Sequence, residues 1–240
     1  MDDNRILFID IETSPLLSWV WEMWQTDVLH VEKQREIICV AYKWEGGKVH
    51  VFGLDKNKPR SIAKKLRELL DRCEIGIAHN GDNFDFKMIN TFIIKHSLPP
   101  PSPYKTIDTL KIARRHFKFS SNKLNELGQY LGVGHKIDTG GFKLWIECIR
   151  KKKWAWEKMK KYNKQDVVLL EKVYNKLRGW AKTPIIRDGF VCPTCGSADI
   201  NFRGWSISKN YKSRKYQCRQ CGSWKTSNIK VKLEKREYLK

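Results

Sequence analysis

The sequence predicts an α/β domain, residues 1–182, followed by a small cysteine-containing domain, residues 183–240. Three observations support this division. Apolar runs typical of strands are followed by amphipathic segments at helical spacing up to about residue 179. Two Cys-x-x-Cys pairs lie in the last quarter of the chain. Between these pairs and the last predicted helix, Lys182, Thr183 and Pro184 interrupt the periodic pattern.

Strands are expected mainly in the first third of the chain. Each is a short apolar or alternating run bounded by turn-forming residues. Gly46 and Gly47 separate two such runs and predict a hairpin. The expected strands are residues 5–11, 36–44, 46–54 and 74–79.

Helices are expected between and after these strands. Pro59 and Ser61 open an amphipathic segment that contains Ile62, Leu66 and Leu70 at helical spacing. The proline-rich sequence at residues 98–103 ends the second helix. The expected helices are residues 61–73, 84–96, 106–118, 122–132, 142–152 and 155–179.

Composition indicates a basic protein with a polyanionic partner. The 240 residues contain 47 Lys and Arg against 26 Asp and Glu, a formal charge of +21, and 41% hydrophobic residues, enough to build a core. Nucleic acid is therefore the first partner to consider. The sequence has no apolar run of the roughly 18 residues that a membrane helix needs, and its start is polar. We expect a cytoplasmic protein without membrane contact.

Asp10 and Glu12 flank Ile11 within the first predicted strand. Residues two apart on a strand face the same side, about 6 to 7 Å apart along the chain. Two unpaired carboxylates in an apolar strand cost several kcal/mol, and a bound divalent cation removes that cost. A strand end that emerges into water is the alternative interpretation.

Two further segments carry polar residues that suit the same site. Asp85 begins a helix directly after a strand, where the helix dipole stabilises a carboxylate, although an ordinary first-turn acid fits equally. Asn80 precedes it as either a turn former or a substrate ligand. Tyr162 and Asp166 are four apart on a helix and therefore neighbours on one face, although a half-buried tyrosine beside a solvated aspartate also fits.

Taken together, these segments resemble the DEDD superfamily of 3′ to 5′ exonucleases, which are DnaQ-like with an RNase H-like fold. The first motif of that family, DxE, matches Asp10 and Glu12. The second, NxxxFD, matches residues 80–85, and the third, YxxxD, matches Tyr162 and Asp166. Lys161 stands where another branch of the family has histidine, so the tyrosine branch matches better. The resemblance covers residues 5–180.

The resemblance implies an RNase H-like mixed sheet flanked by helices and a two-metal mechanism. Asp10, Glu12, Asp85 and Asp166 would hold two Mg²⁺ or Mn²⁺ ions about 3.5 to 4 Å apart. Tyr162 would position the nucleophile. The family further implies that Thr13 approaches the terminal nucleotide.

The implied activity is metal-dependent 3′ to 5′ exonuclease cleavage of phosphodiester bonds. We expect single-stranded DNA as the substrate, with RNA and structure-specific cleavage as open alternatives. The alternative from another class is a non-catalytic adaptor that binds nucleic acid.

The cysteine pairs predict a structural Zn²⁺ site. Cys192-x₂-Cys195 and Cys218-x₂-Cys221 each place two thiolates on one side of a tetrahedral ion. The segment resembles a zinc ribbon, in which two such turns hold a small sheet together. Disulfides or redox chemistry are the alternative, and a reducing compartment disfavours them.

Basic and aromatic residues alternate between the two cysteine pairs. Residues 184–240 carry 13 Lys and Arg against 4 Asp and Glu, a net charge of +9. Cations for phosphates and rings for bases predict nucleic-acid contact, with a solvated basic hairpin as the alternative. The candidate residues are Arg203, Trp205, Lys212, Arg214 and Lys215.

Two features have more than one interpretation. Asp108 precedes a predicted helical run, so helix capping is favoured over a fifth metal-ligand role. Trp19, Trp21 and Trp24 follow the first motif and would either stack on unpaired bases or pack in the core or in a lid.

Overall fold

The computed structural model describes residues 6–24, 27–181 and 191–232. The chain divides into two compact units, Met1–Tyr174 and Asn175–Lys240. The break predicted at Lys182, Thr183 and Pro184 lies outside the described residues. The domain limits 1–182 and 183–240 therefore remain predictions.

A five-stranded mixed sheet forms the centre of the first unit, in the order β5-β4-β1-β6-β7. Its strands are β1 (Ile6–Thr13), β4 (Ile37–Trp44), β5 (Val49–Gly53), β6 (Ile75–Ala78) and β7 (Lys105–Asp108). β1 pairs antiparallel with β4 and parallel with β6, and β6 pairs parallel with β7. The predicted mixed α/β sheet flanked by helices is confirmed.

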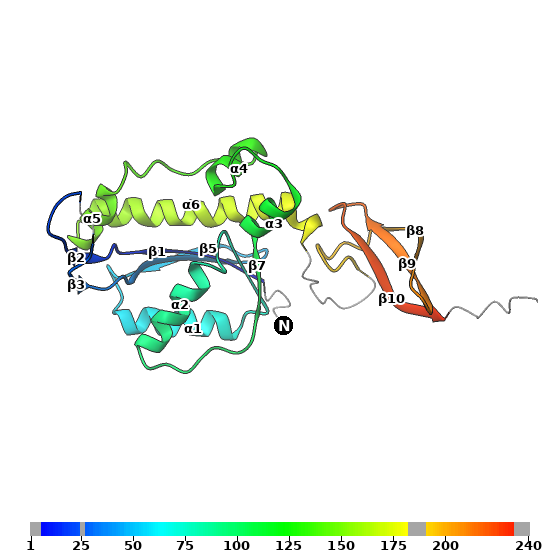
Figure 1. The fold of residues 1–240 in the computed structure, drawn as a ribbon, viewed down its shortest axis with the longest axis horizontal. Coiled ribbons are helices and arrows are strands. Elements are labelled where there is room, and N and C mark those ends of the chain that lie inside the picture. Colours follow the sequence, from blue (N-terminus) through cyan, green and yellow to red (C-terminus); the bar gives the residue numbers. More distant parts are fainter. Residues whose placement is uncertain (1–5, 25–26, 182–190, 233–240) are drawn as a thin grey trace, which may run out of the picture. The chain divides into compact units, whose positions relative to one another are not determined.

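Helices cover both faces of this sheet (Figure 1). The long helix α6 lies on one face, and α1 and α2 lie on the other. The helices are α1 (Pro59–Asp71), α2 (Asp85–Lys95), α3 (Thr109–His116), α4 (Leu124–Tyr130), α5 (Lys143–Ile149) and α6 (Lys153–Leu177), with a 3₁₀ turn, η1 (Arg178–Trp180). Among the described residues, no helix combines the length and apolar character needed to cross a lipid bilayer.

The alternation of β1 assigns its side chains to two different cores. Leu7, Ile9 and Ile11 are buried in the cluster that includes the apolar residues of α1 and α2. Phe8 faces the other way, and its ring packs edge-on against Tyr174 of α6 with centroids 5.6 Å apart. Because successive strand residues alternate, the even-numbered positions that follow Phe8 also face α6.

The prediction for residues 106–118 was wrong in its first turn. Residues 105–108 form β7, which pairs parallel with β6, and the helix begins only at Thr109. The β-branched Thr106 and Ile107 favour a strand, but three or four residues are too few to show a strand period. Asp108 caps α3 as expected, because its Oδ1 accepts a hydrogen bond from the Leu110 amide at 2.9 Å.

A two-stranded ribbon that was not predicted from the sequence follows β1. Its strands are β2 (Leu17–Trp19) and β3 (His30–Lys33). Trp19, Trp21 and Trp24 are 63%, 78% and 90% exposed. They are therefore surface residues rather than core.

The second unit contains a three-stranded antiparallel sheet in the order β10-β9-β8. The strands are β8 (Ile200–Ile207), β9 (Tyr211–Cys218) and β10 (Trp224–Lys232). The register of β8 shifts between Phe202 and Trp205, where Gly204 adopts a φ of +70°. This is a bulge, which glycine permits because it has no Cβ.

Candidate functional site

Three carboxylates from β1 and α6 converge on one point. Asp10 and Glu12 lie on the β1 face that meets α6, and Asp166 lies on α6 itself. One oxygen of each side chain lies within 4.8 Å of one oxygen of each of the others. Asp166 is completely buried.

Asp85 lies beside this cluster without joining it at the same distance. As the first residue of α2, it is buried, and its Oδ1 accepts a hydrogen bond from the backbone amide of Ile11 at 3.2 Å. Ile11 is the residue between Asp10 and Glu12. The second segment is therefore attached directly to the strand that carries the first.

A lysine and three neutral residues contact the site. Lys136 Nζ donates to Asp166 Oδ2 at 2.6 Å and to the Tyr162 hydroxyl at 3.1 Å. The contacts of the other residues fix the β1 acids: Asn163 Nδ2 donates to Asp10 Oδ2, and Trp145 Nε1 donates to Glu12 Oε2 at 3.2 Å.

Burial and mutual repulsion raise the pKa values of the two carboxyl groups on β1. Burial raises the pKa of Glu12 to about 7, repulsion from Asp166 adds to the rise, and Lys136 opposes it. The pKa of Asp10 lies well above its usual range, because it is buried and because Asp166 and Asp85 repel its charge.

The remaining ionisable groups show the same pattern. Burial raises the pKa of Asp85 to about 7, although the hydrogen bond from Ile11 opposes the rise. Burial also raises the pKa of Asp166, with Lys136 opposing, and it raises the pKa of Tyr162, with repulsion from Asp166 adding to the effect. Burial alone would lower the pKa of Lys136, but the attraction of Asp166 raises it above its usual range.

The donor set suits a hard divalent cation. Carboxylate oxygens are the ligands that Mg²⁺ and Mn²⁺ prefer. Among the described residues, Asp166 Oδ1 is buried without a hydrogen-bond partner, which a native protein rarely leaves unexplained. A cation placed among these oxygens would relieve both the repulsion and the unsatisfied acceptor.

A cavity of about 550 Å³ adjoins the Glu12 side of the cluster. Thr13 lines it together with Trp145, the residue that donates to Glu12. Its remaining lining residues are Ser14, Pro15, Leu16, Arg35, Thr139, Gly141 and Phe142. None of the four carboxylates lines this cavity, so the approach of Thr13 to a terminal nucleotide stays a prediction.

Asn80 has a structural role that the structure shows directly. Its φ of +64° is left-handed, a conformation that asparagine tolerates better than most residues. The backbone N–H of Asn80 donates to Asp108 Oδ1 at 2.9 Å. Asp108 therefore holds this turn as well as capping α3. Asp82, in the same turn, forms an ion pair with Lys111 at 2.7 Å.

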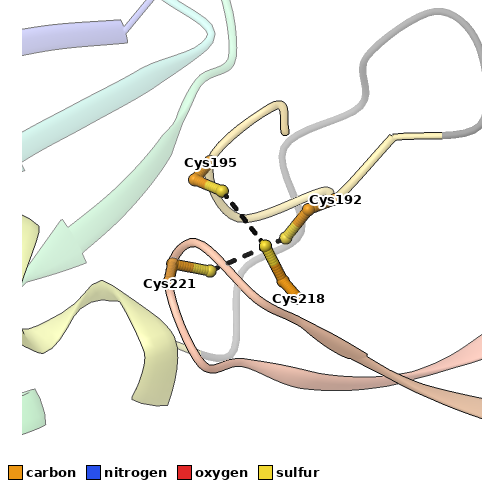
Figure 2. Close-up of side chains that lie close together, drawn as sticks. All are labelled: Cys192, Cys195, Cys218 and Cys221. Atoms are coloured by element: carbon orange, nitrogen blue, oxygen red, sulfur yellow. Dashed lines mark hydrogen bonds between the residues drawn. The ribbon is translucent and has the colours of Figure 1, made fainter. Parts of the chain in front are cut away.

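The four C-terminal cysteines form a second cluster, and Figure 2 shows their sulfur atoms facing one another. Cys192 and Cys221 have Sγ atoms 3.7 Å apart, and those of Cys195 and Cys218 are 3.6 Å apart. A disulfide needs about 2.05 Å, whereas two sulfurs on a tetrahedral Zn²⁺ with bonds of about 2.3 Å lie about 3.8 Å apart. The spacing therefore fits a tetrathiolate metal site.

The predicted nucleic-acid residues of the second unit form a stack of cations and rings. Lys212 Nζ and the Arg214 guanidinium each lie 4.9 Å from the Trp205 ring centroid, and Arg214 also lies 5.6 Å from Phe202. The bulge in β8 brings Phe202 and Trp205 to the same cation. Arg203 and Lys215, also predicted, are exposed.

Three residues of the site were not predicted from the sequence: Lys136, Trp145 and Asn163. Asn163 had a signal, because it lies three residues before Asp166 and therefore on the same helical face. Lys136 and Trp145 had no such signal. Both lie far along the chain from the residues they contact, and only the folded structure brings them to the site.

Comparisons with known proteins agree with this architecture. The family model of the RNase_H superfamily matches residues 7–178. The family B DNA polymerase of the hyperthermophilic archaeon Pyrobaculum calidifontis is similar in structure over 73% of this chain, with 15% sequence identity and a TM-score of 0.54. The chain spans 25% of that polymerase, and at this identity the likeness concerns the fold alone. No curated protein sequence matches this chain.

Proposed function

The chain belongs to the RNase H superfamily, and on this premise we propose that it is a metal-dependent 3′ to 5′ exonuclease of the DEDD type, tyrosine branch. The observation that carries the proposal is the convergence of Asp10, Glu12 and Asp166 within 4.8 Å. Asp85, bonded to the same strand, supplies the fourth acid. Single-stranded DNA is the proposed substrate.

The protein prepares these acids to receive two Mg²⁺ or Mn²⁺ ions. Each acid has one oxygen held by a protein donor: Asn163 for Asp10, Trp145 for Glu12, Lys136 for Asp166 and the Ile11 backbone amide for Asp85. The other oxygen of each is left for a ligand, and the donors fix the side-chain rotamers in advance. When bound, such ions supply a lowered water pKa and charge neutralisation at the phosphate.

Tyr162 and Lys136 act on the reacting groups directly. The Tyr162 hydroxyl lies 3.1 Å from Lys136 Nζ, which keeps the hydroxyl oriented toward the carboxylates. Because the pKa values of Tyr162 and Lys136 are both raised, the tyrosine stays protonated and the lysine stays cationic at neutral pH. Tyr162 therefore orients an attacking water, and Lys136 stabilises negative charge.

We propose that the second unit is a zinc ribbon that adds affinity for the substrate. The tetrathiolate geometry supports one structural Zn²⁺. The stacked rings and cations around Trp205 and Arg214 supply contacts to bases and phosphates.

An end-labelled oligonucleotide tests the activity. Wild-type protein with Mn²⁺ or Mg²⁺ is expected to shorten a 5′-labelled single strand stepwise and to release the label of a 3′-labelled strand as a mononucleotide at once. Asp10→Asn, which keeps the size of the side chain, is expected to do neither. A circular single strand should survive, and an RNA of the same sequence reports the sugar preference.

Two outcomes would contradict the proposal. Cutting of the circular strand identifies an endonuclease. A retarded but uncut band identifies a nucleic-acid-binding adaptor.

A further inference from the structure

A basic surface of the first unit lies outside the carboxylate cluster. Residues 109–125 contain five Lys and Arg and no Asp or Glu. Lys111 is engaged by Asp82 at 2.7 Å. Arg114, Arg115 and Lys118 are exposed, and none of them forms an ion pair with another residue that the structure describes. These three cations therefore have no carboxylate partner within the described part of the chain.

Two aromatic residues flank Lys118 in the sequence, and a third contacts one of them. Phe117 and Phe119 stack with centroids 5.1 Å apart, and Phe119 meets Tyr130 edge-on at 5.3 Å. Tyr130 is 74% exposed. We name Arg114, Arg115, Lys118, Phe119 and Tyr130 the α3–α4 patch.

The topology places the first residue of α3, from which the α3–α4 patch extends, at the same end of the sheet as the carboxylates. Strands β1, β6 and β7 run parallel, so their carboxyl ends lie at the same end of the sheet. Asp10 and Glu12 lie toward that end of β1, and α3 follows directly from β7.

Hydrogen bonds tie the patch to the second motif. The His79 ring contacts Thr109 Oγ1 at 2.8 Å and the backbone oxygen of Asn122 at 2.9 Å. Thr109 begins α3, and Asn122 lies in the loop between α3 and α4. His79 also begins the turn that leads to Asp85. The patch is therefore held in a fixed position relative to the site.

We propose that the α3–α4 patch binds single-stranded nucleic acid beyond the nucleotide being cleaved, with phosphates at Arg114, Arg115 and Lys118 and an unpaired base on Tyr130. This inference rests on the proposed nuclease function for the identity of the strand. Unpaired cations suit a polyanion, and an exposed ring beside them suits a base. The ring requires an unpaired base, because a duplex keeps its base faces stacked.

The full-length chain carrying Asp10→Asn, without added divalent metal, allows binding to be measured without cleavage. Fluorescence anisotropy of a labelled 20-nucleotide single strand is followed from 0.05 to 0.3 M salt. The double variant Arg114→Ala/Arg115→Ala should bind about 25-fold more weakly at 0.1 M salt. The reason is that two phosphate contacts contribute about 0.7 each to the logarithmic salt slope. Its slope should fall by about 1.4.

Tyr130→Ala should behave differently from the charge variant. Loss of a stacked base weakens binding at least about 5-fold, with the salt slope unchanged. A matched control is Arg60→Ala/Lys64→Ala, which removes the same charge from exposed positions on α1. Helix α1 lies on the sheet face opposite α6, while α4 packs on α6 where Gly128 meets Leu169. The control should bind within about 3-fold of the parent, since it loses long-range attraction only.

The results distinguish the patch from the nuclease proposal. Equal weakening by the patch and control pairs would show that net charge alone matters and would overturn the inference. Patch variants that bind as the parent does would also overturn it, even if the wild type cuts DNA. If the wild type cuts nothing but the patch variants lose binding, the inference stands and the proposed function fails. Unchanged melting temperatures confirm that the variants are folded.

Discussion

Replacing Asp108 tests whether this buried acid supports the fold or serves the metal site. Asp108 Oδ1 accepts two hydrogen bonds at 2.9 Å, one from the backbone N–H of Leu110 at the start of α3 and one from the backbone N–H of Asn80. Asp108→Ala removes both. Asp108 is 4% exposed, so water cannot easily replace its side chain.

The expected loss of stability is the sum of two contributions. Loss of the helix cap costs about 1 kcal/mol. Leaving the backbone N–H of Asn80 without an acceptor costs about 1 to 3 kcal/mol. The free energy of unfolding should therefore fall by about 2 to 4 kcal/mol, a large share of the roughly 5 to 15 kcal/mol of a typical domain. Asp108→Asn keeps an acceptor oxygen and should lose less than about 1 kcal/mol.

Urea unfolding and the oligonucleotide assay together separate the two roles. A structural Asp108 predicts that the Asn variant cuts within about 3-fold of the wild-type rate, since no ligand has been lost. A fifth metal ligand predicts the opposite: both variants would lose activity by about 100-fold or more while keeping their stability. That second pattern would refute the capping assignment.

Further predictions concern a histidine, a glycine and the cysteine cluster. Burial lowers the pKa of His79 to about 4, below the 6.5 of the unfolded chain. Between these values only the unfolded state takes up the proton, so wild-type protein should lose up to about 3 kcal/mol as the pH falls from 6.5 to 4. His79→Gln should lack this pH-dependent loss. If urea unfolding shows that the free energy of unfolding falls by the same amount in both proteins between pH 6.5 and 4, the reasoning is contradicted. A Cβ at Gly128 would lie 2.6 Å from Leu169 Cδ1, so Gly128→Ala should destabilise the first unit by about 1 to 3 kcal/mol in urea unfolding, whereas a gain would show that the helix preference of alanine dominates. A chelator should release one Zn²⁺ per chain and unfold the second unit, seen as loss of its amide dispersion by NMR, because so small a sheet needs its metal; retained dispersion would argue against a structural ion.

Periodic patterns made most of the fold predictable. Long apolar runs and amphipathic segments identified the β1, β4 and β5 strands and most helices, because burial on one face imposes a period of 2 or 3.6. β7 was mistaken for helix because its four residues are too short to show a period. The β2–β3 ribbon had no apolar alternation to reveal it, since its side chains are largely exposed.

The candidate site was predictable only where its residues lie in short motifs. Asp10 and Glu12 sit on one strand, and Tyr162 and Asp166 on one helix, so local spacing places each pair on one face. Lys136 reaches Asp166 from a loop 30 residues earlier, and Trp145 reaches Glu12 from 133 residues later. No local pattern encodes such contacts, because only the packed fold brings these residues together.

The most direct test of the central claim is a Mn²⁺ titration of the wild-type chain and of Asp166→Asn, followed by calorimetry and by cleavage of the labelled strand. The wild type should bind Mn²⁺ and cut. The variant should keep its melting temperature, bind Mn²⁺ at least about 10-fold more weakly and cut at least about 100-fold more slowly. An Asp166→Asn protein that binds Mn²⁺ and cuts as the wild type does would contradict the claim that the carboxylates of β1 and α6 form the metal site.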